Sequence, residues 1–160
     1  MQTSPLSDDE EAVWRALARV VIVLPRLFDA ALLRRENLTH SEYLVLMHLS
    51  EAPDRSRRMS ELATGMPITP SGLTRLVERL EREGMVARRT ADGDRRSQIA
   101  TLTEAGLERL RSAWPAHLDD VRRIVIDNLS ELDLPTLTRA LNAIATQETD
   151  TQQTRRRSAM

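Results

Sequence analysis

The residues with the clearest chemical potential are the arginines in the middle of the chain. All 23 basic residues are arginine, and ten of them lie between residues 55 and 101, where only six acidic residues occur. That segment therefore carries a net charge of +4 and the remainder −5, which gives the net charge of −1 for the whole chain. Guanidinium groups bind phosphate and the edge of guanine through paired hydrogen bonds. A basic segment in an acidic protein is typical of a nucleic-acid-binding surface, although solvated arginines would give the same count.

Other kinds of chemistry find little support in the sequence. The absence of cysteine excludes structural disulfides and thiolate metal ligands. The three histidines, His40, His48 and His117, include no H-x-x-x-H pair, so we expect no metal and no other cofactor. A glycine-rich phosphate loop, a nucleophile elbow and a metalloprotease pair are all missing from the sequence. We therefore expect a protein that is not an enzyme.

A helix that starts at Thr69 carries three of these arginines. Thr69 is a good N-cap, and Pro70 occupies the first helical position, where its missing N–H costs nothing. Three- and four-residue spacing then predicts one apolar face and one polar face. The apolar face contains Leu73, Leu76, Val77 and Leu80, and the polar face contains Ser71, Thr74, Arg75, Glu78 and Arg82. For Glu78 we favour an ion pair with Arg75 or Arg82 of the same helix, and the alternatives are contact with cytosine or a side chain that faces away.

A two-stranded ribbon is expected to follow this helix. Gly84 fits the position after a helix end, and the residues around 86–90 and 98–102 alternate as strands do. The turn at 91–94 leads directly to Arg95 and Arg96. A short helix over 60–65 before the polar-faced helix completes a helix-turn-helix arrangement, which the ribbon extends to a winged form. A polar helix beside an arginine-tipped ribbon suits the two grooves of a DNA duplex.

Long apolar helices are predicted on both sides of this unit. We expect an N-terminal dimerisation helix in 1–35, a winged helix-turn-helix domain in 36–103, C-terminal dimerisation helices in 104–146 and a disordered tail in 147–160. Capping boxes at Ser7–Glu10 and Thr39–Glu42 mark two of the helix starts, and Pro25 and Pro115 are expected to bend the long helices. The basic residues Arg55, Arg57 and Arg58 form a connector that is either solvated or in contact with phosphate. The fold class expected is mainly α.

The apolar stripes of the terminal helices indicate the oligomeric state, and the N-terminal residues and the length of the apolar runs indicate the cellular location. The terminal helices have broad apolar stripes that a second copy of the chain would cover, and a dimer would present two reading helices to a palindrome. The N-terminal residues show no basic region followed by an apolar run, and no segment approaches 18 apolar residues. We therefore expect a cytoplasmic homodimer with no membrane partner.

The run from Asp94 to Thr103, DRRSQIATLT, resembles the wing motif of the MarR family of bacterial transcription regulators. The resemblance extends over SELA at 60–63, LTRLV at 73–77 and LEREGMV at 80–86, and it covers roughly residues 8–146 in helix order. It implies a homodimeric DNA-binding regulator of a palindromic site, most often a repressor of its own or a neighbouring gene. The alternative that we keep is a helical dimeric adaptor whose winged helix binds protein.

The resemblance also implies roles for individual residues. By motif position, Ser71, Thr74 and Arg75 would contact the major groove, and Arg96 would enter the minor groove with Asp94 as its salt-bridge partner. The DNA backbone would be contacted by Arg88, Arg89 and Arg95. Many members of the family release DNA when a small aromatic or phenolic acid binds. Candidate ligand-binding residues for such an effector are Arg15, Arg19, His40 and Tyr43.

Overall fold

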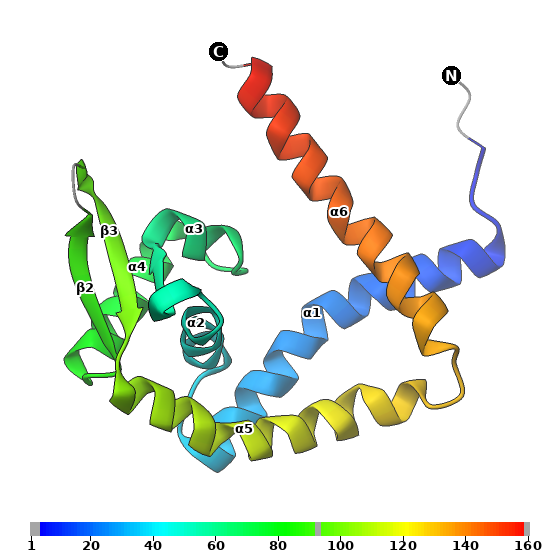
Figure 1. The fold of residues 1–160 in the computed structure, drawn as a ribbon. Helices are drawn as coiled ribbons and strands as arrows, with labels where there is room; N and C mark the ends of the chain where they lie inside the picture. Colours follow the sequence, from blue (N-terminus) through cyan, green and yellow to red (C-terminus); the bar gives the residue numbers. More distant parts are fainter. Residues whose placement is uncertain (1–3, 92–93, 159–160) are drawn as a thin grey trace. The chain divides into compact units, whose positions relative to one another are not determined.

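The computed structural model describes residues 4–91 and 94–158, with the side chains of 94–96 and 147–158 outside the description. It divides into two units, Met1–Asp120 and Val121–Met160, and each unit is described by itself. The α-helices and the strands β2 and β3 are labelled in Figure 1.

The first helix, α1 (Asp8–Glu36), has the predicted start and nearly the predicted end. The Ser7 hydroxyl accepts a hydrogen bond from the Glu10 amide, and the Glu10 carboxylate accepts one from the Ser7 amide, so the capping box is confirmed. The helix continues through Pro25 and ends at Asn37, whose φ of 49° is left-handed. Only its C-terminal part is buried in the chain, at Phe28, Ala31 and Leu32.

The second helix, α2 (His40–Ser50), forms the centre of the core. Its predicted capping box is present, because the Glu42 carboxylate accepts from the Thr39 amide at 2.7 Å and the Thr39 hydroxyl accepts from the Glu42 amide at 3.2 Å. Among the described residues, 18 form the buried core, to which α2 contributes Tyr43, Val45, Leu46 and Leu49, all fully buried. This burial makes α2 the element against which the rest of the core packs.

The predicted helix-turn-helix consists of α3 (Met59–Thr64) and α4 (Pro70–Arg82). The Thr69 hydroxyl accepts from the Gly72 amide at 3.2 Å, and Pro70 is the first residue of α4, which confirms the predicted cap. The buried residues of α4 are the four predicted from the spacing, Leu73, Leu76, Val77 and Leu80. The opposite face of α4 is therefore available for contact.

The sheet has three strands instead of the predicted two. The predicted ribbon is β2 (Val86–Ala91) paired with β3 (Asp94–Leu102), and the third strand is β1 (Ser56–Arg58), in the antiparallel order β1-β3-β2. Arg57 lies opposite Ala100 in this sheet, and the hydroxyls of Ser56 and Thr101 are 2.8 Å apart. The segment expected to be a basic connector is thus the short 3-10 turn Pro53–Arg55 followed by an edge strand. Three residues without apolar alternation carry no strand signal of their own, so only the pairing with β3 reveals the strand.

The C-terminal elements are α5 (Glu104–Ile124), a 3-10 turn (Ile126–Leu129) and α6 (Leu134–Ser158). Helix α5 continues through Pro115, and α6 extends twelve residues past the predicted helix end at 146. The expectation of a disordered tail therefore differs from the structure. The segment 147–158 is polar but contains no proline or glycine, and nothing in it stops a helix that is already formed.

Many large apolar side chains remain exposed along α1. Val13 is 68% exposed and Trp14 61%, and Val20, Val21 and Ile22 are also exposed. A monomer seldom leaves such a row open to water. Among the described residues, no helix is long and apolar enough to cross a membrane.

Candidate nucleic-acid interface

The exposed face of α4, which we call the reading face, contains the residues predicted to contact the major groove of DNA. Ser71, Thr74 and Arg75 are all exposed. The Thr74 hydroxyl donates to the Pro70 carbonyl at 3.0 Å, which leaves its oxygen free to accept. Arg75 forms no ion pair with any residue whose side chain is described, so its guanidinium is available to a base or a phosphate.

Arg88 on β2 forms its ion pairs and hydrogen bonds with glutamates of α4. Its Nε donates to the Glu81 carboxylate at 2.7 Å, and its Nη1 lies 3.4 Å from the Glu78 carboxylate. The Glu81 carboxylate also accepts from the Arg88 amide at 3.2 Å. The predicted ion pair of Glu78 within α4 is therefore wrong, because the arginine that Glu78 meets comes from the adjacent strand. These contacts hold the wing strand against α4 and leave Arg88 only 25% exposed.

The wing arginines are placed by the ladder between β2 and β3. Arg89 of β2 is exposed and lies opposite Ile99 of β3. Ala91 lies opposite Asp94, near the end of the two-stranded ribbon. The backbone of Asp94, Arg95 and Arg96 belongs to β3, whereas their side chains lie outside the described part of the structure. The predicted Asp94–Arg96 pair therefore stays a prediction. The Gln98 amide donates to the Thr90 hydroxyl at 3.2 Å and links the two strands below the tip.

A closely packed turn after α4 fixes the position of the wing relative to α4 and α5. Gly84 has a φ of 74°, which suits its predicted place after the helix end. The Thr103 hydroxyl donates to the Gly84 carbonyl at 2.7 Å and accepts from the Gly106 amide at 3.0 Å. A side chain at Gly106 would overlap the Met85 carbonyl oxygen. Glycine is thus required where α5 passes the turn after α4.

The two flanking arginines of the edge strand also have partners. Arg55 donates to the Glu104 carboxylate at 2.7 Å, which joins the 3-10 turn to α5, and Arg58 donates to the Ser97 hydroxyl at 2.8 Å. Neither residue is a freely solvated connector charge. Arg57 between them is half-buried in the strand.

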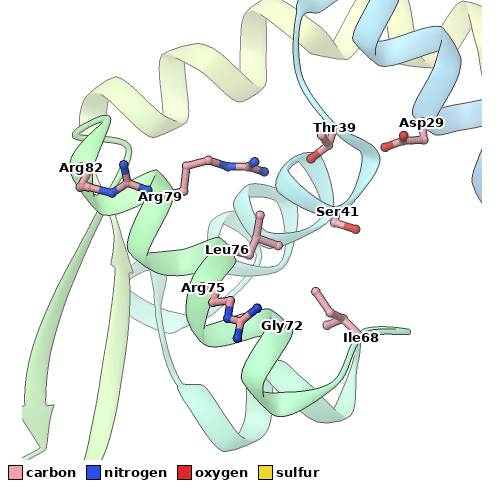
Figure 2. Close-up of a pocket in the computed structure, with 9 residues that line it drawn as sticks. All are labelled: Asp29, Thr39, Ser41, Ile68, Gly72, Arg75, Leu76, Arg79 and Arg82. Atoms are coloured by element: carbon pink, nitrogen blue, oxygen red, sulfur yellow. The ribbon is translucent and has the colours of Figure 1, made fainter.

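A cavity of about 480 Å³ adjoins the reading face of α4 (Figure 2). Its walls come from α4, from the start of α2 and from Asp29 of α1. Arg75, Arg79 and Arg82 all line it, and Arg79 extends toward the start of α2, where it meets the Glu42 carboxylate at 2.7 Å. The sequence indicated the helical face but not this concentration of charge beside α2.

The candidate effector residues do not form one site within the chain. Arg15 is bound to Glu11 on the surface of α1, and Arg19 is exposed. His40 lies beside Asp29, whose carboxylate accepts from the His40 amide at 2.9 Å. Asp29 is 14 residues along α1 from Arg15, roughly 21 Å at the helical rise. Among the described residues, no group of three or more side chains suits a metal ion.

A partly buried aromatic cluster instead contains His40 and Tyr43, together with Phe28 and His117. The ring centroid of Phe28 lies 5.4 Å from His40 and 5.3 Å from His117, and Tyr43 lies 4.2 Å from His117. Burial lowers the pKa of His40, with the charge of His117 acting in the same direction and Asp29 opposing it. Burial also lowers the pKa of His117, against the effect of Asp120, and raises the pKa of Tyr43 to about 12. The sequence alone does not reveal this cluster because its members lie on three different helices.

Comparisons with known proteins identify the family to which the chain belongs. A MarR family model matches residues 36–97. The crystal structure of Sco3205, a MarR family regulator from Streptomyces coelicolor in complex with DNA, has a TM-score of 0.79 and 36% sequence identity, covering 90% of this chain and 91% of that one. AbsC from the same organism has a TM-score of 0.80 and 36% identity, covering 92% of this chain and 99% of that one.

A curated relative is similar over a shorter region. The transcriptional repressor MprA of Escherichia coli K12 is 31% identical over 84 residues, which is 52% of this chain. The chain spans about half the length of this curated relative, 48%. The shared fold, the length of the match with the Streptomyces structures and the family model agree with one another. The chain belongs to the MarR family of winged-helix transcription regulators.

Proposed function

We propose that this protein binds double-stranded DNA as a homodimer and regulates transcription from a palindromic site. The observation that carries the proposal is the exposed face of α4, where Arg75 has no ion-pair partner among the described side chains. An unpaired guanidinium on a polar helix beside a basic wing is suited to the major groove. The DNA complex of the similar Sco3205 supports this assignment.

Homodimer formation is supported by the exposed apolar residues of α1. Val13 and Trp14 lie at the start of a row that the described part of unit Met1–Asp120 leaves uncovered. Covering such a row with a second copy would remove apolar surface from water. Sedimentation equilibrium is expected to report a dimer, and Val13→Asp should shift it toward the monomer.

Repression is the direction that we propose for the regulation. MprA is named a transcriptional repressor, and a dimer bound across a promoter blocks polymerase by occupancy. Binding to the upstream region of its own gene or a neighbouring gene is the simplest expectation. A reporter fused to that region should become more active when the gene for this protein is deleted.

Effector control by a small aromatic or phenolic acid remains part of the proposal. The half-buried ring of His40 beside Phe28 is the feature that favours it, since an aromatic acid could stack there and accept a hydrogen bond from the neutral imidazole. Adding benzoate to a preformed complex with DNA should then lower its fluorescence anisotropy. His40→Phe should remove this response while leaving DNA binding in place.

The decisive experiment measures DNA binding directly. Fluorescence anisotropy with a labelled duplex from the upstream region should show a specific complex that excess random DNA does not displace. Arg75→Ala should weaken it by about 1–3 kcal/mol, that is, by roughly 5- to 150-fold, because a direct contact between the Arg75 guanidinium and the duplex is lost. Arg111→Ala provides the matched control, since Arg111 is exposed on α5 and 4.0 Å from Glu108.

Salt dependence separates this function from the alternative of a protein-binding adaptor. Affinity for DNA should fall steeply with salt, with a slope proportional to the number of phosphates neutralised. An apolar protein contact would respond little. Absence of a competitor-resistant complex at moderate salt would count against the DNA-binding proposal. An Arg75→Ala variant with the same DNA affinity as the parent protein would count against the assigned role of Arg75.

A further inference from the structure

The cavity between α4 and the start of α2 has an excess of positive charge. Three arginines of α4 line it, and Asp29 is the only acidic residue among those that line it. The Glu42 carboxylate lies 2.7 Å from Arg79 and neutralises that one guanidinium. Arg75 and Arg82 form no ion pair with any residue whose side chain is described. Two unpaired cations facing one cavity indicate an anionic occupant.

The start of α2 adds hydrogen-bonding groups on the opposite wall. Thr39 and Ser41 both line the cavity, and because the Thr39 hydroxyl donates to the Glu42 carboxylate at 2.6 Å, Ser41 supplies the hydroxyl that can donate to an oxyanion. They belong to the N-terminal end of an eleven-residue helix, which has a partial positive charge. Figure 2 shows these residues across the cavity from the arginines of α4. The arrangement therefore offers an oxyanion contacts from two sides.

The position of the cavity points to the source of the anion. Arg75 both lines the cavity and belongs to the exposed reading face of α4. An anion held there would lie at the edge of any duplex that α4 reads. In such complexes, backbone phosphates follow the groove on either side of the reading helix.

We propose that this cavity is a phosphate-binding site in which Arg82 and Arg75 hold one phosphate group of the DNA backbone against the start of α2. The inference rests on the proposed function and names a contact that the sequence did not assign. Arg79 is the positioning residue, because its pair with Glu42 fixes α4 to the cap of α2. Asp29 opposes the anion, although its carboxylate is partly occupied by the His40 amide.

Two substitutions with opposite expected effects test the proposal. Arg82→Ala should weaken binding about tenfold and reduce the slope of log affinity against log salt by about 0.9 for each half-site. Asp29→Asn keeps the acceptor for the His40 amide and removes a negative charge, so it should tighten binding roughly threefold. Arg111→Ala is the control and should change neither quantity.

A second comparison separates a phosphate contact from a base contact. Phosphate contacts carry no sequence information, so Arg82→Ala should weaken the upstream duplex and a random duplex of equal length by the same factor. A loss confined to the upstream duplex would assign Arg82 to a base and overturn the proposal. Unchanged affinity and salt slope for Arg82→Ala would overturn it too, while DNA binding by the parent protein would keep the proposed function intact.

A free anion is distinguished by exchanging salts. Replacing chloride with inorganic phosphate at constant ionic strength should weaken DNA binding by the parent protein more than DNA binding by Arg82→Ala, because free phosphate competes for the same cavity, while their salt slopes differ. If phosphate displaces DNA from the parent protein but not from Arg82→Ala, and their salt slopes agree, the cavity takes a free anion and the backbone assignment is wrong. Failure of the parent protein to bind either duplex would instead defeat the proposed function itself.

Discussion

Replacing Glu42 with alanine should uncouple the reading helix from its support. Glu42 is only 6% exposed and has two roles at the start of α2. One carboxylate oxygen accepts from the Thr39 amide at 2.7 Å and the Thr39 hydroxyl at 2.6 Å. The other oxygen lies 2.7 Å from the Arg79 guanidinium. A single side chain therefore caps α2 and ties it to α4.

The expected cost follows from these two roles. Loss of the capping contacts costs about 1 kcal/mol of unfolding free energy. Loss of the ion pair adds about 1 kcal/mol, a value kept small because the Arg79 side chain is 42% exposed and screened by water. The sum of about 2 kcal/mol is a large part of a total stability of about 5–15 kcal/mol. For a chain of this size it corresponds to a decrease in Tm of roughly 4–8 °C.

Urea unfolding followed by circular dichroism measures this loss, at one protein concentration because dimerisation would affect stability. Glu108→Ala serves as the control, since Glu108 is an exposed glutamate 4.0 Å from Arg111, and should change stability by less than about 0.5 kcal/mol. The double variant of Glu42→Ala with Arg79→Ala should lose about 1 kcal/mol less than the sum of the single variants.

The outcome also bears on DNA binding. Glu42→Ala should weaken DNA binding even under conditions where the protein is fully folded, because α4 is no longer held at one position against α2. The reasoning fails if Glu42→Ala unfolds with the parent free energy, or if the two single substitutions are simply additive. Additivity would mean that Glu42 and Arg79 do not stabilise each other in solution.

Three further predictions concern the junction and the aromatic cluster. Gly106→Ala should destabilise the fold by about 2–4 kcal/mol in urea unfolding, since its Cβ would overlap the Met85 carbonyl, and a neutral result would contradict the close packing. Because the pKa values of His40 and His117 are lowered from their ordinary 6.5, the folded chain binds fewer protons than the unfolded chain, so stability should fall as pH drops below 6.5. His117→Phe should flatten this dependence in thermal melts between pH 7 and 5, and an unchanged slope would assign it to other groups. Tyr43→Phe should be neutral or stabilising by up to about 1 kcal/mol at pH 7, because the buried hydroxyl has no hydrogen-bond partner among the described residues. It should also abolish the loss of stability expected between pH 10 and 12, where the folded chain retains the Tyr43 proton that the unfolded chain releases.

Local chemistry made the helix starts and the face of α4 predictable from the sequence. Each cap depends on residues at most three positions apart, as at Ser7–Glu10 and Thr39–Glu42, so the sequence itself contains the whole interaction. The burial of α4 follows from a spacing that repeats with the helical turn, and Thr69 and Pro70 mark where the repeat begins.

Interactions between distant segments were not predictable in the same way. The strand Ser56–Arg58 exists because β3 offers it a partner more than 40 residues later in the chain. Glu78 lies within reach of arginines of its own helix, yet it pairs with Arg88 of β2. A local pattern cannot decide between such partners, because the choice depends on how the strand is seated against the helix.

The sequence by itself therefore determined which residues are exposed on α4 and which type of fold presents them, because helical periodicity and caps are local properties. Only the tertiary structure decided which arginines remain available. It paired Arg88 with Glu81 and Arg79 with Glu42, and it left Arg75 and Arg82 beside a cavity next to α2. The physical reason is that the partner of a charged side chain is set by distances of a few ångströms between segments that the sequence separates.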